Sequence, residues 1–304
     1  MKRSKVMMFA FLAPALFSFL LVYLYPTVRT FIMSFYYVKN VTDRVSFWEY
    51  VGLENYAKQF QSSIFITSLS NIFYIWLWGG IIILLSALVF AILLTSGVRF
   101  KSFFRAVIYL PNIVSAVALA TMWIQYAYSP KFGLFKTIFE ALGLKGLAAT
   151  EWTSPDNQLM SMMLAYCFGM IGYFMLIFMA GIEKIPVDYY EAATIEGANV
   201  SGKFFKITLP LMRDVFRTSI VWWSINALTF FIWSQMFSPR IPDSGTVTPM
   251  VVMYFTVFGR DFMVNDPRLI NAGAGAAVGV ILTLLVFVMF VIVNLLIKEE
   301  KLEY

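Results

Sequence analysis

The chain has 304 residues, of which 60% are hydrophobic and 13% are charged, and its mean hydropathy is +0.76. This composition excludes a water-soluble protein and is typical of a protein embedded in a lipid bilayer. The absence of histidine and the single cysteine, Cys167, exclude histidine-based catalysis, an internal disulfide and a metal site built from thiolates or imidazoles. The net charge of +6 fits an excess of Lys and Arg on cytoplasmic loops, so we expect no nucleic-acid partner.

Apolar stretches of the length that a helix needs to cross the hydrocarbon core, about 20 residues, recur along the chain. The predicted spans are residues 7–35, 72–94, 106–126, 159–182, 216–237 and 270–297. The first is longer than the apolar part of a signal peptide, and Tyr25-Pro26-Thr27 is no small-residue cleavage site, so we expect it to be retained. The sequence therefore predicts an all-α integral membrane protein with six transmembrane helices, and residues 1–304 form one membrane domain.

The distribution of basic residues predicts the orientation of the spans. Lys and Arg are more numerous in the loops on the N-terminal side than in the longer loops on the opposite side. We therefore expect both termini and the loop over residues 183–217 to be cytoplasmic. The outer segments, residues 38–70, 127–158 and 238–269, are too short to be separate domains. Within the last of them, residues 248–258 are apolar but too short to span, which predicts a short interfacial helix.

The spans contain essentially no ionisable residues; Arg29 is the exception, and its long side chain can reach the headgroups from near the outer end of the first span. A proton-coupled carrier would have no group to titrate. Residues 197–203 match the phosphate-loop pattern G-x-x-x-x-G-K, but Phe204 replaces the required Ser or Thr. A helix opened by Pro186, and not a strand, is expected before this segment. We therefore expect no enzyme activity and no cofactor in this chain, and any ATP hydrolysis in a separate protein.

The cytoplasmic loop has the pattern of a helical hairpin. Ala192 and Ala193, which follow Glu191, leave little bulk on one face, and Gly197 permits the positive φ at which a helix stops. After nine residues the pattern continues with Ile207, Leu209 and Pro210, and the proline is expected to break the chain before the fifth span. Small and apolar residues exposed on such a hairpin indicate a docking site for another protein.

The complete pattern, E-A-A-x-x-x-G-x9-I-x-L-P, resembles the coupling motif of the membrane subunits of binding-protein-dependent ABC importers. Further matches extend over nearly the whole chain and resemble the carbohydrate-uptake branch, which includes the maltose-type and glycerol-phosphate-type permeases. They are V-G-L-E-N-Y at residues 51–56, F-R-A at 104–106 with Leu110-Pro111, and A-G-I at 180–182 with Ile185-Pro186. The chain departs from the branch at residues 238–245, where a Gly-Gly-Pro turn is usual, and at Gly133-Leu134-Phe135-Lys136, where G-L-L-N is usual.

The resemblance implies a type I ABC importer permease in a bacterial cytoplasmic membrane. Such a subunit forms half of a pore with a second permease, receives solute from an extracytoplasmic binding protein, and couples to an ATPase dimer that binds ATP and Mg. By the same resemblance Glu191 would pair with a basic residue of the ATPase, and Ala192, Ala193 and Gly197 would permit a close fit. The departures lie in outer segments, where a binding protein docks, so they leave the particular solute open.

A stripe of aromatic and neutral polar residues on the fifth span is the candidate solute path. Trp222, Asn226, Thr229 and Trp233 follow helical spacing, and an Asn at membrane depth needs a partner or a wet cavity. Packing against a neighbouring helix or lipid remains the alternative for this stripe. Trp123 and Tyr126 are a weaker candidate, because aromatic belts place such residues at span ends. The small residues at 272–279 favour close helix packing.

The sequence thus favours a non-catalytic permease subunit for a sugar or oligosaccharide. A permease for a non-sugar solute is the closest alternative, because the coupling motif is shared by importers of many solutes. A secondary carrier would need inverted repeats and titratable or ion-binding groups. A membrane-embedded enzyme would need clusters of carboxylates or metal ligands within the spans.

Overall fold

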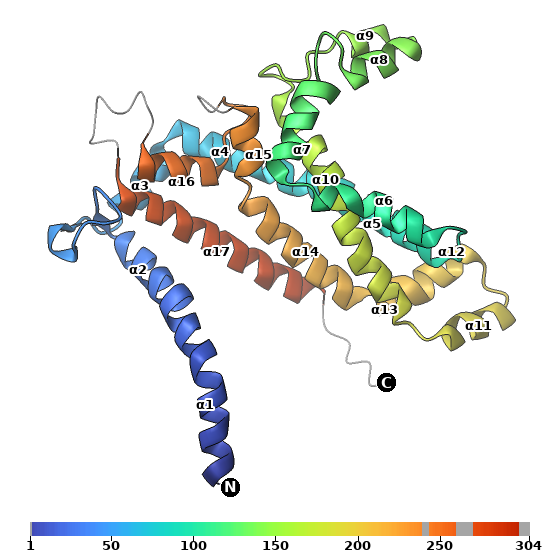
Figure 1. The fold of residues 1–304 in the computed structure, drawn as a ribbon, viewed down its shortest axis with the longest axis horizontal. Helices are drawn as coiled ribbons and strands as arrows, with labels where there is room; N and C mark the ends of the chain where they lie inside the picture. Colours follow the sequence, from blue (N-terminus) through green and yellow to red (C-terminus); the bar gives the residue numbers. More distant parts are fainter. Residues whose placement is uncertain (1, 239–242, 260–269, 298–304) are drawn as a thin grey trace. The chain divides into compact units, whose positions relative to one another are not determined.

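The computed structural model describes residues 2–238, 243–259 and 270–297. Within them, five helices are long and apolar enough to cross a membrane, and a bent pair of helices supplies a sixth crossing (Figure 1). The prediction of a six-span helical protein is therefore confirmed. The chain divides into two compact units, residues 1–66 with 252–284 and residues 67–251 with 285–304. The single domain over residues 1–304 stays a prediction.

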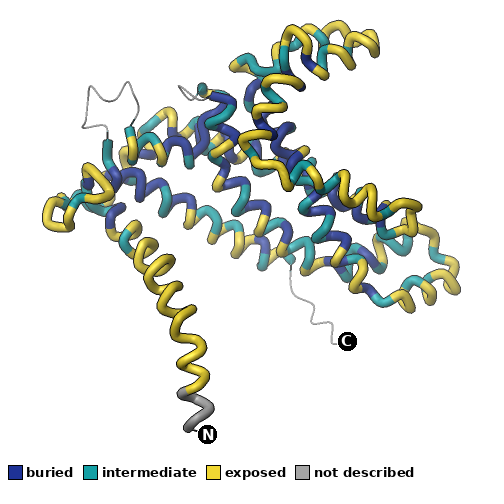
Figure 2. Tube along the Cα trace, in the orientation of Figure 1, coloured by how far each residue is buried: buried dark blue, intermediate teal, exposed yellow. Residues whose placement is uncertain are grey.

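The first unit begins with a long apolar helix that makes few contacts within the chain. Its first elements are α1 (Lys2–Phe19), the π-helical turn η1 (Leu20–Leu24) and α2 (Tyr25–Met33). The π turn precedes Pro26, which has no N–H to donate, so the hydrogen-bond ladder shifts there. The side chains of this span are almost all exposed, as the yellow tube in Figure 2 shows. Its apolar surface is therefore available to lipid or to another protein.

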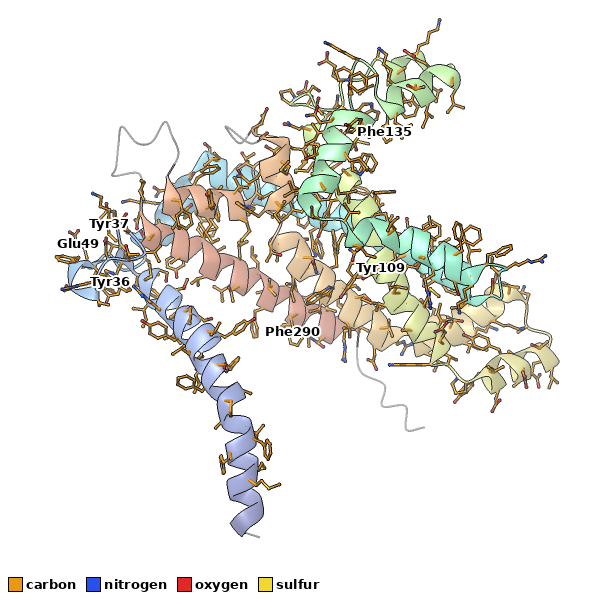
Figure 3. The ribbon with its side chains drawn as sticks, viewed as in Figure 1. Tyr36, Tyr37, Glu49, Tyr109, Phe135 and Phe290 are labelled. Carbon is orange, nitrogen blue, oxygen red and sulfur yellow. The ribbon has the colours of Figure 1, made fainter. Side chains whose placement is uncertain are left out.

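The V-G-L-E-N-Y segment closes the turn that follows the first span. The elements of this turn are β1 (Tyr36–Tyr37), the 3₁₀ turn η2 (Val45–Phe47), β2 (Glu49–Tyr50) and α3 (Glu54–Gln61). Tyr36 and Tyr37 pair antiparallel with Tyr50 and Glu49 (Figure 3). Asn55 is buried, and its Nδ2 donates to the carbonyl oxygens of Ser34 and Tyr36, both over 2.9 Å. A buried amide with two backbone partners fixes the path of the chain here.

Arg29 is held by this same turn. Its Nη2 donates to the carbonyl oxygen of Val41 over 3.1 Å, and its Cζ lies 5.6 Å from the centroid of the Trp48 ring. A guanidinium over an indole contributes about 0.5–2 kcal/mol, depending on exposure. The structure gives this side chain partners within the chain, and its reach to the headgroups stays a prediction.

Close packing accounts for the small residues of the sixth span, α17 (Ala272–Leu296). A Cβ at Gly273 would collide with the carbonyl oxygen of Tyr36, and one at Gly275 would collide with Val257 of α16. That neighbour, α16 (Pro249–Phe258), is the short helix expected over residues 248–258. Asn271 stands just before α17 and donates from Nδ2 to Oδ1 of Asn55 over 3.1 Å. The predicted close packing at residues 272–279 is confirmed.

The second unit is a helical bundle around α10. Its membrane helices are α4 (Ser63–Tyr74, shared with the first unit), the π turn η3 (Ile75–Gly79), α5 (Gly80–Thr95), α6 (Lys101–Ile113), α7 (Ala116–Met122), the π turn η4 (Trp123–Ala127), α10 (Gln158–Glu183), α14 (Arg213–Leu228) and α15 (Ile232–Phe237). α10 packs against both α5 and α6. At Gly172 the approach to α6 is so close that a Cβ would collide with the carbonyl oxygen of Ile108 and lie 2.6 Å from the Cα of Tyr109, which Figure 3 labels.

The third span is bent, and not the continuous crossing expected over residues 106–126. α6 and α7 meet at an angle of 98°. Pro111 lies in the last turn of α6, and the Ser115 hydroxyl caps α7 by accepting a hydrogen bond from the Ala118 N–H over 3.3 Å. A proline that removes a donor and a serine that starts a new helix together explain the bend.

The fifth span is interrupted between α14 and α15. Thr229 leaves the helical conformation with φ −93° and ψ 18°. The interruption is supported from residues 243–248: Thr248 Oγ1 donates to the carbonyl oxygen of Phe230 over 2.7 Å, and Ser234 Oγ bonds the carbonyl oxygen of Thr246. Irregular backbone at membrane depth is tolerated only where protein or a wet cavity surrounds it. Residues 239–242, part of the departure at 238–245, lie outside the described residues.

The outer segment between the third and fourth spans is anchored by aromatic side chains. It contains α8 (Leu134–Ala141) and α9 (Lys145–Ala148). Phe135 of α8, labelled in Figure 3, lies in edge contact with Trp123, Tyr128 and Trp152, at centroid distances of 5.7, 5.3 and 5.4 Å. Gly133 precedes α8 at a point where a Cβ would lie 2.9 Å from the carbonyl oxygen of Ala127. The segment is thus fixed to the outer end of η4.

Candidate functional site: a membrane cavity and a cytoplasmic hairpin

The breaks in the third and fifth spans border one cavity. It has a volume of about 470 Å³ and lies entirely within the second unit. Its lining residues are Pro111, Asn112, Val114, Ala116, Leu119, Tyr166, Gly169, Met170, Asn226, Thr229, Phe230, Phe231, Ile232 and Trp233. The volume falls in the range of small-molecule sites, about 300–1,000 Å³. Two interrupted helices that line one cavity are typical of a solute path through a membrane.

Asn112 supplies a hydrogen-bond acceptor on the α6 side of the cavity. Its Nδ2 donates to the carbonyl oxygen of Gly169 over 3.1 Å and contacts the sulfur of Met170 at 3.6 Å. Both partners belong to α10, so the amide also ties α6 to α10. Because an amide carries its donors and acceptor on different atoms, these contacts leave Oδ1 available to a ligand. Asn112, Tyr166 and Met170 were not among the predicted site residues, although an Asn directly after Pro111 in an apolar span was a signal.

Asn226 supplies a donor and an acceptor on the α14 side. Its Nδ2 donates to the carbonyl oxygen of Trp222 over 2.8 Å, one turn earlier in the same helix. This bond uses one of the two amide hydrogens and leaves the Oδ1 carbonyl for a ligand. Thr229 Oγ1 also donates to its own helix, to the carbonyl oxygen of Ile225 over 2.8 Å. This bond leaves the lone pairs of the hydroxyl oxygen available to accept from a ligand.

The predicted stripe is divided by the structure. Asn226, Thr229 and Trp233 line the cavity, and Phe230 lies beside them. Trp222 is 44% exposed and is not a lining residue. Trp222 lies one turn before Asn226 on the unbroken part of α14, where the cavity does not reach, and helical spacing alone does not tell where a cavity ends.

Trp123 and Tyr126, the weaker candidates for the solute path, also lie outside the cavity. Trp123 packs on Tyr128 and Phe135, with ring centroids 5.2 and 5.7 Å away, and Tyr126 is 66% exposed. Neither residue is among those that line the cavity.

The loop over residues 183–217 is a helical hairpin, as its sequence indicates. Its elements are α11 (Val187–Ile195), α12 (Val200–Lys203), the π turn η5 (Phe204–Thr208) and α13 (Leu209–Leu211). Pro186 stands at the start of α11, so residues 197–203 follow a helix and do not form a phosphate loop. Pro210 lies in the first turn of α13, and the chain leaves helical geometry at Met212, two residues later than expected.

The tip of the hairpin is a complete helix stop. Gly197 has φ +74°, which only glycine adopts without strain. The Ala198 N–H donates to the carbonyl oxygen of Ala193 over 2.8 Å, and the Gly197 N–H donates to that of Thr194 over 3.0 Å, the two bonds of a Schellman motif. The Asn199 side chain then caps α12 by accepting from the Gly202 N–H over 2.7 Å. The expected positive φ at Gly197 is confirmed.

Side-chain bonds hold the two arms of the hairpin together. The Tyr190 and Thr208 hydroxyls lie 2.9 Å apart, and Lys203 Nζ donates to Thr194 Oγ1 over 2.8 Å. The outer surface stays uncovered: Ile195 is 87% exposed and Val200 is 83% exposed. Two large apolar side chains in this state mark a surface that another protein can cover.

The motif residues lie at this hairpin in two groups. Glu191 and Ala192 are exposed on α11, and Ala193 is half-buried beside them. Ile207 and Leu209 are half-buried on the returning arm. Within the described part of the chain the Glu191 carboxylate makes no ion pair, so it is free to meet a partner's cation.

No cluster of three or more metal-ligating side chains occurs among the described residues. An ion pair near the hairpin joins Lys101 Nζ to Glu183 Oε1 over 2.6 Å, between the start of α6 and the end of α10. Both side chains are well exposed, so the pair contributes about 0–1 kcal/mol.

The chain is similar in sequence to known membrane transport proteins. A family described as "Binding-protein-dependent transport system inner membrane component" matches residues 87–301. The chain is 29% identical over 259 residues to the diacetylchitobiose uptake system permease protein NgcF of Streptomyces coelicolor, covering 82% of this chain and 70% of that protein. It is 31% identical over 289 residues to the arabinooligosaccharides transport system permease protein AraP of Halalkalibacterium halodurans, covering 94% and 85%.

A solved structure shows the same fold. It is a bacterial ABC transporter involved in the import of the acidic polysaccharide alginate, and one of its chains superposes with a TM-score of 0.78 at 17% identity. The superposition covers 97% of this chain and 96% of that one. The type I permease fold that the motif implied is therefore confirmed.

Proposed function

The chain belongs to the family of inner membrane components of binding-protein-dependent transport systems, and from this membership we propose that it is the permease subunit of an ATP-driven importer of a sugar or oligosaccharide. It forms half of a translocation pore with a second permease, in a bacterial cytoplasmic membrane with both termini inside. The related proteins NgcF and AraP are named as permeases for diacetylchitobiose and arabinooligosaccharides, which supports a saccharide as the solute.

One structural relationship carries the proposal: the hairpin and the cavity are built on the same two helices. α10 supplies Tyr166 and Met170 to the cavity and leads at its other end into the hairpin. α14 leads out of the hairpin and supplies Asn226 to the cavity. At 1.5 Å per residue, the end of α10 at Glu183 lies about 20 Å along the helix from Met170. A displacement of the hairpin therefore moves two walls of the cavity together.

Close packing makes these helices move as one body near the hairpin. A Cβ at Gly181 of α10 would come within 2.9 Å of Val215 on α14. Interdigitated helices transmit a shift because the interior is densely packed and resists compression. In this proposal an ATPase dimer, which binds ATP and Mg, receives the hairpin in a cleft, and ATP-driven closure of that dimer displaces it.

The motif residues then have separate roles. Glu191 pairs with a basic residue of the ATPase through a charge-assisted hydrogen bond. Ala192, Ala193 and Gly197 permit the close approach, while the exposed Ile195 and Val200 are covered on docking. Ile207, Leu209 and Pro210 join the hairpin to α14.

The experiment is reconstitution of the chain with its second permease, ATPase and binding protein in proteoliposomes. ATP-dependent uptake is measured over a panel of labelled saccharides, with amino acids and small peptides as non-sugar solutes. Uptake of a saccharide that requires both ATP and binding protein supports the proposal. Uptake of a non-sugar solute alone would identify an ABC permease for another class, and uptake driven by an ion gradient without ATP would identify a carrier.

A further inference from the structure

The lining of the cavity between the interrupted spans bears on which saccharides can enter it. Resting on the proposed function, we infer that the permease conducts neutral glycans and excludes those that carry carboxylates or phosphates. The cavity provides the two kinds of surface that a neutral sugar needs. The amide of Asn226 and the hydroxyl of Thr229 can bond hydroxyl groups, and the rings of Trp233 and Phe230, which pack on Tyr166, add apolar lining.

Every one of the cavity's lining residues is uncharged at neutral pH. A sugar hydroxyl that enters can exchange its hydrogen bonds to water for hydrogen bonds to an amide or a hydroxyl. The exchange costs little free energy. A carboxylate that enters loses its hydration shell and finds no cation among these side chains to replace it. An unpaired charge in such surroundings is strongly disfavoured, whereas a hydrogen-bonded neutral group is tolerated.

The charged residues on the same helices lie far from the lining positions. On α6, Arg105 precedes Pro111 by six residues, or about 9 Å along the helix axis. On α14, Arg217 precedes Asn226 by nine residues, or about 13 Å. On α10 the charged residue is Glu183, at the hairpin end, and α7 and α15 carry none. These groups lie toward the hairpin ends of the helices, and none of them lines the cavity, so an anion there has no cation in direct contact.

The contrast with the alginate transporter shows that the fold does not decide this property. That transporter is involved in the import of an acidic polysaccharide, and its fold matches this chain with a TM-score of 0.78. At 17% identity the side chains that face a solute are free to differ. Selection between neutral and acidic glycans therefore resides in the cavity side chains, and in this chain those side chains are neutral.

The test measures ligand binding to the purified complex of both permeases and the ATPase without the binding protein, so that its selectivity does not enter. The probes are trisaccharide pairs that differ only in a C6 hydroxymethyl or carboxylate: mannose with mannuronate, glucose with glucuronate, and galactose with galacturonate. Binding is measured by saturation-transfer NMR. For each pair in which either member binds, we expect the uronate to bind at least about tenfold more weakly.

Two variants localise the effect to the cavity. Met170→Lys places a cation beside Asn112 and is expected to raise the affinity for the uronate relative to its neutral partner several-fold. Asn226→Asp keeps the side-chain volume and adds a negative charge, so it is expected to weaken uronate binding further while neutral binding changes less. Asn226→Asp supplies the test if Met170→Lys does not assemble.

The outcomes separate this inference from the proposed function. Equal or tighter binding of uronates in the unaltered complex would overturn the neutral selectivity and leave a saccharide permease. An unchanged uronate preference in assembled Met170→Lys and Asn226→Asp complexes would also overturn it. Binding of no saccharide, with no saccharide-dependent ATPase activity in the complete importer, would overturn the proposed function itself.

Discussion

Trp223 donates its indole N–H to the carbonyl oxygen of Trp76 over 2.8 Å, and Trp76 donates in return to the Ser224 hydroxyl over 2.9 Å. The Trp223 ring rests against Gly80, where a Cβ would come within 2.5 Å of its Nε1. The carbonyl of Trp76 belongs to the π turn η3, and such a turn frees backbone groups for an outside donor. This reciprocal pair fixes α14, the helix that joins the hairpin to the cavity, against the second span.

Trp223→Phe is expected to destabilise the protein by about 0.5–1.5 kcal/mol, because it removes the indole hydrogen bond to the Trp76 carbonyl oxygen, which keeps only the Gly80 N–H. The melting temperature of the detergent-purified permease measures this loss. Trp222→Phe is the matched control, since the Trp222 side chain is 44% exposed whereas that of Trp223 is 1% exposed. Equal melting temperatures for the two variants would contradict the role assigned to the pair.

Gly197→Val is expected to weaken ATPase attachment more than Glu191→Ala does. A β-branched residue at φ +74° costs about 1–2 kcal/mol and distorts the tip of the hairpin. Copurification of the ATPase with the permease pair is the measurement, with both permeases altered to avoid redundancy.

Gly97→Val is the control for backbone strain alone. Gly97 has φ +88° in a turn with nothing within 4 Å of its Cβ position, outside the hairpin. Normal ATPase attachment and transport in the Gly197→Val complex, or an equal loss in Gly97→Val, would refute the docking role.

Asn226→Leu is expected to leave the complex assembled and to abolish transport or change its sugar preference. The substitution removes the amide from the cavity and leaves solute hydroxyls without a partner, a defect that discriminates strongly. ATP-dependent uptake in proteoliposomes is the measurement. Trp222→Ala should transport nearly normally, because Trp222 does not line the cavity. Normal uptake with unchanged preference in Asn226→Leu would favour packing over a solute path.

A cysteine introduced at Ser201 is expected to react with an impermeant thiol reagent only in inside-out vesicles. Ser201 is exposed on α12 of the hairpin, and the excess of Lys and Arg predicts that this loop is cytoplasmic. Cys167 is 2% exposed within α10 and is replaced by alanine to give a clean background. Labelling of intact cells at this position would reverse the topology and remove the basis for ATPase docking.

Asn55→Ala is expected to loosen the turn after the first span. The change removes the donor to the carbonyl oxygens of Ser34 and Tyr36 and the acceptor for Asn271, with an expected loss of about 1–3 kcal/mol. Limited proteolysis from the outer side over residues 38–50 measures it. Lys58→Ala, in the exposed pair with Glu54, is the control and should change the digestion rate little. Equal protection of the two variants would show that the turn is held by other contacts.

The sequence alone determined the class of this protein. Apolar length predicts the spans, because a helix must bury its backbone bonds over a bilayer of fixed thickness. The hairpin could also be predicted from the sequence, because Pro186 and Gly197 are local signals whose conformational effects act within a few residues. The same short segment carries the coupling motif, and this motif was enough to indicate the family.

Only the tertiary structure decided where the site lies. Spacing placed Trp222 in a stripe with Asn226 and missed Asn112, because periodicity identifies a shared face within one helix and not where neighbouring helices leave a cavity. The interruption of the fifth span at Thr229 is supported by Thr248, a residue of another segment whose hydroxyl donates to the carbonyl oxygen of Phe230. The cavity likewise requires α6 to end at Ile113 and α10 to approach it at Gly172. Contacts between residues far apart in the chain leave no periodic signal, so the neutral lining of the cavity is visible only once the helices are packed.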